Sequence, residues 1–107
     1  MFSLLHVSPR RNLQSIYKHG VSPAFAAGER AECWFCAPSL RAWAIAHVAE
    51  RHEVDPRDVI VVRVRVPVTH LTHRGRGLWT CPDVVRDIVS VAVTFAPAAV
   101  AAVAAVA

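Results

Sequence analysis

The hydrophobic positions of the chain change their period several times, and each change marks an expected element. Residues 2–7 form a short apolar run, which predicts a buried strand. Residues 58–66 begin as a continuous apolar run and then alternate, with Arg63 and Arg65 on one face, and they give the clearest strand signal. Three further strands are expected at residues 33–37, 78–81 and 87–95.

Two segments have helical periodicity instead. In the first, Ser8 is expected to cap a helix that has Pro9 at its first position, where a missing N–H costs nothing. Gly20 is the expected stop of this helix. The second helix is expected over residues 38–52 and begins at a Pro-Ser pair. The apolar side of the first helix holds Leu13, Ile16 and Tyr17, and that of the second holds Leu40, Trp43, Ala44, His47 and Val48.

The element order is therefore β-α-β-α-β-β-β, which predicts an α+β domain on a mixed or antiparallel sheet. The 107 residues are enough for one hydrophobic core and too few for two. We expect residues 1–95 to form this single domain. Residues 96–107 form a low-complexity Ala/Val tail, which we expect to be a frayed helix or disordered. The segments 21–32 and 69–77 are expected to be loops.

Composition narrows the class of protein. Apolar residues make up 54% of the chain and charged residues 19%, as in globular proteins. The net charge of +4 comes almost entirely from arginine, since Lys18 is the only lysine. This charge suits a nucleotide or a nucleic acid, although a coding bias toward arginine explains it equally well.

Three cysteines are too few, and odd in number, for a secreted disulfide framework. The first residues have no signal-peptide pattern, and the apolar tail is shorter than the ~20 residues that span a bilayer. We therefore expect a cytoplasmic protein with no membrane partner.

The stretch LLHVSPRRNLQSIYKHGVSP, residues 4–23, resembles the first motif of ADP-ribosyltransferase-fold proteins. Small bacterial and phage members, DNA-modifying toxins and RNA 2′-phosphotransferases begin with a strand ending in His-x-Ser/Thr, followed by an Asn-Leu-x-x-Ile helix and a glycine. The matching residues are His6, Ser8, Asn12, Leu13, Ile16 and Gly20.

Two later blocks resemble the same family. WFCA, residues 34–37, followed by SLRAWAIAHVAE, is similar to the aromatic strand and alanine-rich helix of the family. GRGLWTCPDVVRDIVSV, residues 75–91, resembles the stretch that carries the last catalytic motif. The resemblance covers most of residues 3–95 and implies a split mixed β-sheet with two helices.

The resemblance implies that NAD+ is bound as a substrate. In the family the strand histidine bonds a ribose hydroxyl and the Ser/Thr two places later bonds the nicotinamide amide; these positions correspond to His6 and Ser8. Because residues i and i+2 of a strand point the same way, both side chains can share one pocket wall. The first helical turn offers free N–H groups to a diphosphate, and Arg10 can pair with that anion. Asn12 belongs to the same cofactor-binding set, and Trp34 is expected to cover the nicotinamide ring by stacking.

The implied reaction is a glycosyltransferase-class transfer of ADP-ribose to a macromolecular acceptor, protein or nucleic acid, with release of nicotinamide. It proceeds through an oxocarbenium-like state, as in glycoside cleavage. By analogy the protein is a toxin or a phage/host-conflict effector, with an antitoxin as a further partner. The family's last motif carries a Glu, but no Glu follows Glu53, so Asp83 is the expected carboxylate. The expected catalytic residues are His6, Trp34 and Asp83.

Two alternatives stay open. One is an RNA 2′-phosphotransferase of the same fold, with Arg41, Arg63 and Arg65 as candidates for contacts to a 2′-phosphate. The other is a non-catalytic NAD- or nucleotide-binding domain that lacks the carboxylate. A metal site is not expected, although Cys33-x-x-Cys36 and His70-x-x-His73 have ligand-like spacing. In a strand, Cys33 and Cys36 would point to opposite faces.

Overall fold

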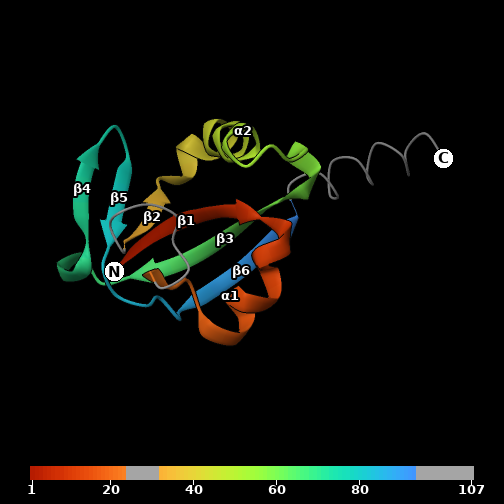
Figure 1. Cartoon of the computed structure of the whole chain (residues 1–107). Helices are drawn as coiled ribbons and strands as arrows, with labels where there is room; N and C mark the ends of the chain where they lie inside the picture. Colours follow the sequence, from red (N-terminus) through yellow and green to blue (C-terminus); the bar gives the residue numbers. More distant parts are fainter. Residues whose placement is uncertain (24–31, 94–107) are drawn as a thin grey trace.

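Six strands form one antiparallel sheet, with a helix on each side (Figure 1). The structure is a computed structural model that describes residues 1–23 and 32–93. The expected tail, the last two residues of the final expected strand and most of the 21–32 loop lie outside these ranges. The strands are β1 Phe2–Pro9, β2 Cys33–Cys36, β3 Val59–Val66, β4 Thr72–Gly75, β5 Leu78–Cys81 and β6 Ile88–Val93, and the α-helices are α1 Leu13–His19 and α2 Arg41–Arg51. The strand order across the sheet is β4-β5-β2-β1-β3-β6.

The α+β class and the two helices are confirmed, but the sheet is not mixed. Every described strand pair is antiparallel, which is one of the two arrangements that the element order predicts, so the mixed sheet implied by the family resemblance is wrong. One strand was also missed, since β4 lies in a segment expected to be a loop. The turn after β4 consists of Gly75, Arg76 and Gly77, all with positive φ, and it returns the chain so that β4 pairs with β5.

The first strand is longer than the sequence indicates, and this changes the role of Ser8. β1 pairs with β3 at eight positions, from Phe2 opposite Val66 to Pro9 opposite Val59. Ser8 is therefore a strand residue, and the expectation that it caps the helix is wrong. One 3-10 turn follows the strand before α1 begins at Leu13. The predicted stop is confirmed: the Gly20 N–H donates to the Ile16 carbonyl over 2.8 Å, and Gly20 has a φ of 77°.

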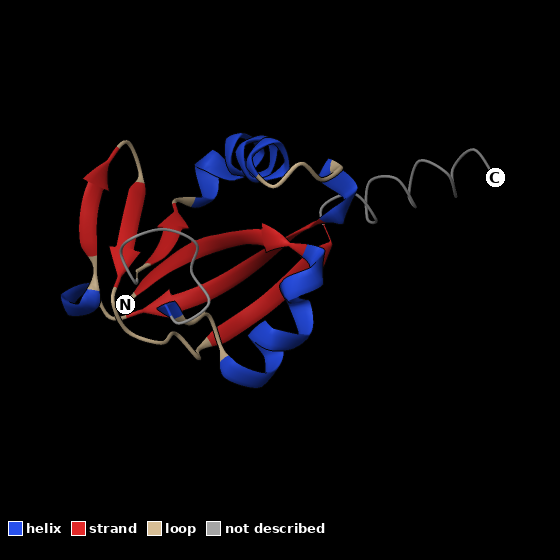
Figure 2. Ribbon diagram, viewed as in Figure 1, coloured by secondary structure: helices blue, strands red, loops and turns tan. Residues whose placement is uncertain are grey.

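The two helices lie on opposite faces of the sheet (Figure 2), and its central strands are buried on both sides. The α1 face holds the larger cluster, in which Ile16 packs with Phe35 and the alternate valines of β3. The α2 face holds a smaller cluster around Leu5 and Ala44. Burial on both sides explains why β3 begins as a continuous apolar run rather than an alternating one.

The two halves of the sheet meet at a narrow join. β1 and β2 share one Cα pair, Leu5 opposite Cys36, whereas β2 pairs with β5 at four positions. Beyond this pair β1 continues to Pro9 while β2 runs back to Cys33, and no ladder connects them. The sheet is therefore open between the second half of β1 and the first half of β2. Within the described ranges, no helix combines the length and apolar character that a membrane span requires.

Candidate functional site

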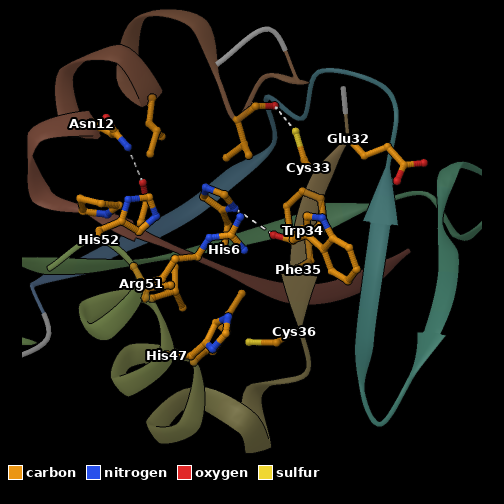
Figure 3. Close-up of a pocket in the computed structure, with 18 of the residues that line it drawn as sticks. His6, Asn12, Glu32, Cys33, Trp34, Phe35, Cys36, His47, Arg51 and His52 are labelled. Carbon is orange, nitrogen blue, oxygen red and sulfur yellow. Dashed lines mark hydrogen bonds between the residues drawn. The ribbon is translucent and has the colours of Figure 1, made fainter. Parts of the chain in front are cut away.

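A cavity of about 410 Å³ lies where β1 and β2 separate, with α1 on one side and α2 on the other (Figure 3). Its size falls in the range of small-molecule sites, roughly 300–1,000 Å³. β1, β2 and α2 all contribute polar or aromatic side chains to its wall. The polar and aromatic residues of the wall include His6, Ser8, Asn12, Glu32, Trp34, Trp43, His47, Arg51 and His52.

His6 lies in the middle of the cavity and bridges its two strands (Figure 3). Its Nδ1 lies 2.9 Å from the backbone carbonyl oxygen of Trp34. Since a carbonyl oxygen only accepts, Nδ1 must donate, and the neutral ring then has its lone pair on Nε2. Burial lowers the pKa of His6, and the bond to the Trp34 carbonyl opposes this in part. The ring is therefore held as a neutral acceptor, and Nε2 has no partner among the described residues.

Ser8 follows His6 at the next position on the same face of β1, as the sequence predicts. It is buried, and its Oγ accepts a hydrogen bond from Asn12 Nδ2 over 2.8 Å. This bond fixes the hydroxyl oxygen and leaves its proton free to be donated. The predicted residues His6, Ser8 and Asn12 are thus brought together on the cavity wall.

Trp34 faces the cavity from the opposite side of the gap (Figure 3). Its backbone carbonyl is fixed by His6, while 53% of the residue is exposed to solvent. A large aromatic side chain exposed at the wall of a cavity has an open face for stacking. The sequence-based choice of Trp34 as a pocket residue therefore fits its position.

The arginine in the described wall of the cavity is Arg51. Arg10 and Arg11 are both exposed, and neither lines the cavity. Arg11 Nη2 donates to His52 Nδ1 over 3.4 Å, and His52 is part of the wall. Burial lowers the pKa of His52, as do the nearby charges of Arg11, Arg51 and His47. The neutral His52 ring, which accepts at Nδ1, carries its proton on Nε2 and can donate it to an anion.

The carboxylate at the cavity is Glu32, which the sequence reasoning missed. Asp83, the expected carboxylate, does not line the cavity; its side chain is 63% exposed, and its Oδ2 lies 3.9 Å from His70 Nδ1. Glu32 lines the cavity two positions before Trp34, and both of its oxygens lie 3.2 Å from Arg74 Nη2. The available signal was its position: Glu32 directly precedes β2 and stands two residues before Trp34, so both side chains can face the same side.

The remaining candidate residues lie elsewhere. Arg41, Arg63 and Arg65 do not line the cavity. Arg63 donates to Ser3 Oγ over 3.4 Å, and Arg65 pairs with Asp87 at 3.0 Å. Three basic residues at the end of α2 were not singled out as site residues from the sequence but belong to the wall. They are His47 and Arg51 of the helix and His52, which caps it.

The cysteines are buried thiols. Cys33 packs in the α1-side cluster and Cys36 in the α2-side cluster, so they point to opposite faces as predicted. Burial raises the pKa of Cys33 to about 12. Among the described residues, no group of three or more His, Cys, Asp or Glu side chains is arranged to hold a metal ion.

No protein-family model matches the chain, and no curated protein matches its sequence.

Proposed function

We propose that the protein binds NAD+ in the cavity between β1 and β2 and transfers its ADP-ribose to a macromolecular acceptor, releasing nicotinamide. The observation that carries this proposal is the state of His6. Its Nδ1 is occupied by the Trp34 carbonyl, and its Nε2 lone pair is available in a cavity of nucleotide size. A neutral imidazole held in this way accepts a hydrogen bond from a sugar hydroxyl.

The other wall residues match the remaining parts of the dinucleotide. The Ser8 hydroxyl, positioned by Asn12, donates to the carbonyl of the nicotinamide amide. Trp34 covers the nicotinamide ring. The Nε2–H of His52, which lines the cavity, donates to the diphosphate. Arg11, the hydrogen-bond partner of His52, adds positive charge beside it and takes the place expected for Arg10.

The reaction breaks the bond between the ribose C1′ and the nicotinamide nitrogen. The electron pair of that bond leaves with nicotinamide, and the C1′ centre acquires oxocarbenium character. An acceptor nucleophile then forms a bond to C1′ and loses its proton to the solvent. Glu32, the carboxylate at the described cavity wall, is the group that stabilises the positive charge at C1′. Asp83 has no role in this scheme.

One observation favours a second candidate, a non-catalytic nucleotide-binding domain. Both oxygens of Glu32 already contact Arg74, whose Nε also donates to Thr80 Oγ1 over 3.0 Å. A carboxylate held by a guanidinium is less effective at stabilising a cation. The RNA 2′-phosphotransferase alternative has no comparable support, because its candidate residues Arg41, Arg63 and Arg65 do not line the cavity.

The proposal is tested by titrating the protein with NAD+ in a calorimeter and by measuring nicotinamide release with and without RNA and protein acceptors. We expect saturable binding, and roughly tenfold weaker binding for His6→Ala, which is the loss of about 1.4 kcal/mol. His70→Ala removes an exposed imidazole away from the cavity and serves as the matched control. Binding without release supports the second candidate. Absence of binding, or equal binding by His6→Ala, contradicts the proposal.

A further inference from the structure

Three side chains of α2 form a continuous row along the cavity. Trp43, His47 and Arg51 are spaced four residues apart, so they lie on one face of the helix. All three line the cavity, and the row extends over roughly 12 Å at 1.5 Å per residue. We call this row the α2 stripe. It changes along its length from an aromatic ring to a guanidinium.

The aromatic end of the α2 stripe is rigid and exposed. The rings of Trp43 and His47 stack with centroids 4.9 Å apart and planes at 10°. This contact covers part of one face of the indole, yet Trp43 is 49% exposed to solvent. With Trp34, also half exposed, two indoles are open to solvent on the wall of one cavity. Each exposed indole face is a surface on which a flat ring can stack.

The cationic end of the α2 stripe has no acidic partner. Neither Arg51 nor the nearby Arg11 forms an ion pair with a carboxylate in residues 1–23 or 32–93. Arg57, Arg65 and Arg74 each pair with one, whereas most of the described arginines, like Arg51, do not. Unpaired guanidinium groups beside exposed aromatic rings are the combination that binds single-stranded nucleic acid, with bases on the rings and phosphates on the cations.

We infer that the α2 stripe binds a single-stranded nucleic acid, with a base stacked on Trp43 and a phosphate held by Arg51. A duplex would not present the face of a base to the indole, because its bases are stacked on one another. An acidic peptide would neutralise Arg51 but leave the indole without a matching ring. The position of the stripe on the cavity wall makes a single strand the acceptor of the transfer reaction. Only this acceptor role depends on the proposed function.

The test is fluorescence anisotropy with labelled DNA and RNA strands of about ten nucleotides, without NAD+. We expect both strands, or one of them, to bind more tightly than the duplex of the same sequence. Trp43→Ala should weaken binding by roughly five- to a hundredfold, and Trp43→Phe by less. Arg51→Gln should reduce the slope of log affinity against log salt by about 0.7. Tyr17→Ala and Arg76→Gln remove an exposed ring and an exposed charge elsewhere and should change neither quantity.

The inference is overturned if no single strand binds at low salt, or if duplex or polyglutamate binds as tightly. It is also overturned if Trp43→Ala, shown to be folded by its thermal transition, binds like the parent. These results do not depend on the NAD+ titration. If a strand binds and NAD+ does not, the inference is supported and the proposed function is contradicted. If NAD+ binds and no strand does, the proposed function is supported and the inference is overturned.

Discussion

The imidazole of His6 donates a hydrogen bond to the backbone carbonyl of Trp34 across the gap between β1 and β2, with 2.9 Å between the two atoms. This side chain connects β1 and β2 beyond their single backbone pair, Leu5 with Cys36. The contact fixes both the orientation of the ring and the position of its proton. The site therefore contains an acceptor nitrogen whose geometry is set before any ligand arrives.

The lowered pKa of His6 predicts that stability depends on pH. The folded protein binds the proton less readily than the unfolded chain, whose histidine pKa is near 6.5. The contribution of His6 is thus fully present above that value and is lost as the pH falls through the lower, folded pKa. The free energy of unfolding should fall between pH 7.5 and pH 5, by at most about 1.4 kcal/mol per pH unit for one proton.

Urea denaturation across this pH range measures the effect. His6→Gln keeps a donor for the Trp34 carbonyl but does not titrate, so its slope should be shallower. His52, whose pKa is also lowered, accounts for part of the remaining slope. A variant with the same pH dependence as the parent would show that His6 is not the titrating group.

Trp34→Ala separates the two contributions of Trp34. The variant keeps the backbone carbonyl that His6 binds and removes only the indole. Because the residue is 53% exposed, we expect little change in the melting temperature. The affinity for NAD+ should fall by roughly two- to tenfold, the value of an aromatic pair, while Trp34→Phe should retain most of it. Calorimetric titration of the three proteins with NAD+ measures these affinities. An alanine variant with parental affinity would exclude stacking by this ring.

Glu32→Gln and Asp83→Asn distinguish the two candidate carboxylates. With an acceptor present, we expect Glu32→Gln to slow nicotinamide release by about a hundredfold with a similar affinity for NAD+, since the charge acts in the transition state. Stability should fall by about 1 kcal/mol or more, because the side chains of Glu32 and Arg74 are only 22% and 30% exposed and Arg74 loses its charged partner. Asp83→Asn should react at the parental rate. The opposite pattern would return the catalytic role to Asp83.

Gly20→Ala tests the glycine that ends α1 at the cavity wall. Gly20 has a φ of 77°, and a Cβ there would lie 2.7 Å from the carbonyl oxygen of Val85. We expect a loss of about 2 kcal/mol or more in the free energy of unfolding, from backbone strain and this clash together. Gly75→Ala is the control, because its φ is 88° but nothing lies within 4 Å of its Cβ. It should lose only about 1 kcal/mol. Equal losses in urea denaturation would mean that the clash has no cost.

Local pattern was sufficient to predict most elements and the shared orientation of His6 and Ser8. The alternation of residues 4–8 correctly placed His6 and Ser8 on one wall, and Gly20 correctly ended α1. Ser8 was misread as a cap because Ser-Pro before a helical stripe is a typical cap sequence. The pairing of β1 with β3, which extends the strand through Pro9, overrides that local preference.

The other errors concern contacts between distant parts of the chain. β4, with the sequence THRG, has little intrinsic preference for a strand and forms because β5 pairs with it. Glu32 reaches the cavity because β2 lies beside β1, and His52 because α2 ends near the turn that contains Arg11. No periodicity within one segment encodes such neighbours. The candidate site was therefore predicted on β1 and β2 and missed on α2.

The single pair of Leu5 with Cys36 has a mechanical consequence. The three strands β4, β5 and β2 form one leaf of the sheet, and β1, β3 and β6 form the other. Because one backbone pair joins the two halves, we expect amide exchange to be faster in β4, β5 and β2 than in β1, β3 and β6. A ligand in the cavity would contact both halves, so NAD+ should slow exchange in β2 toward the rate of β1.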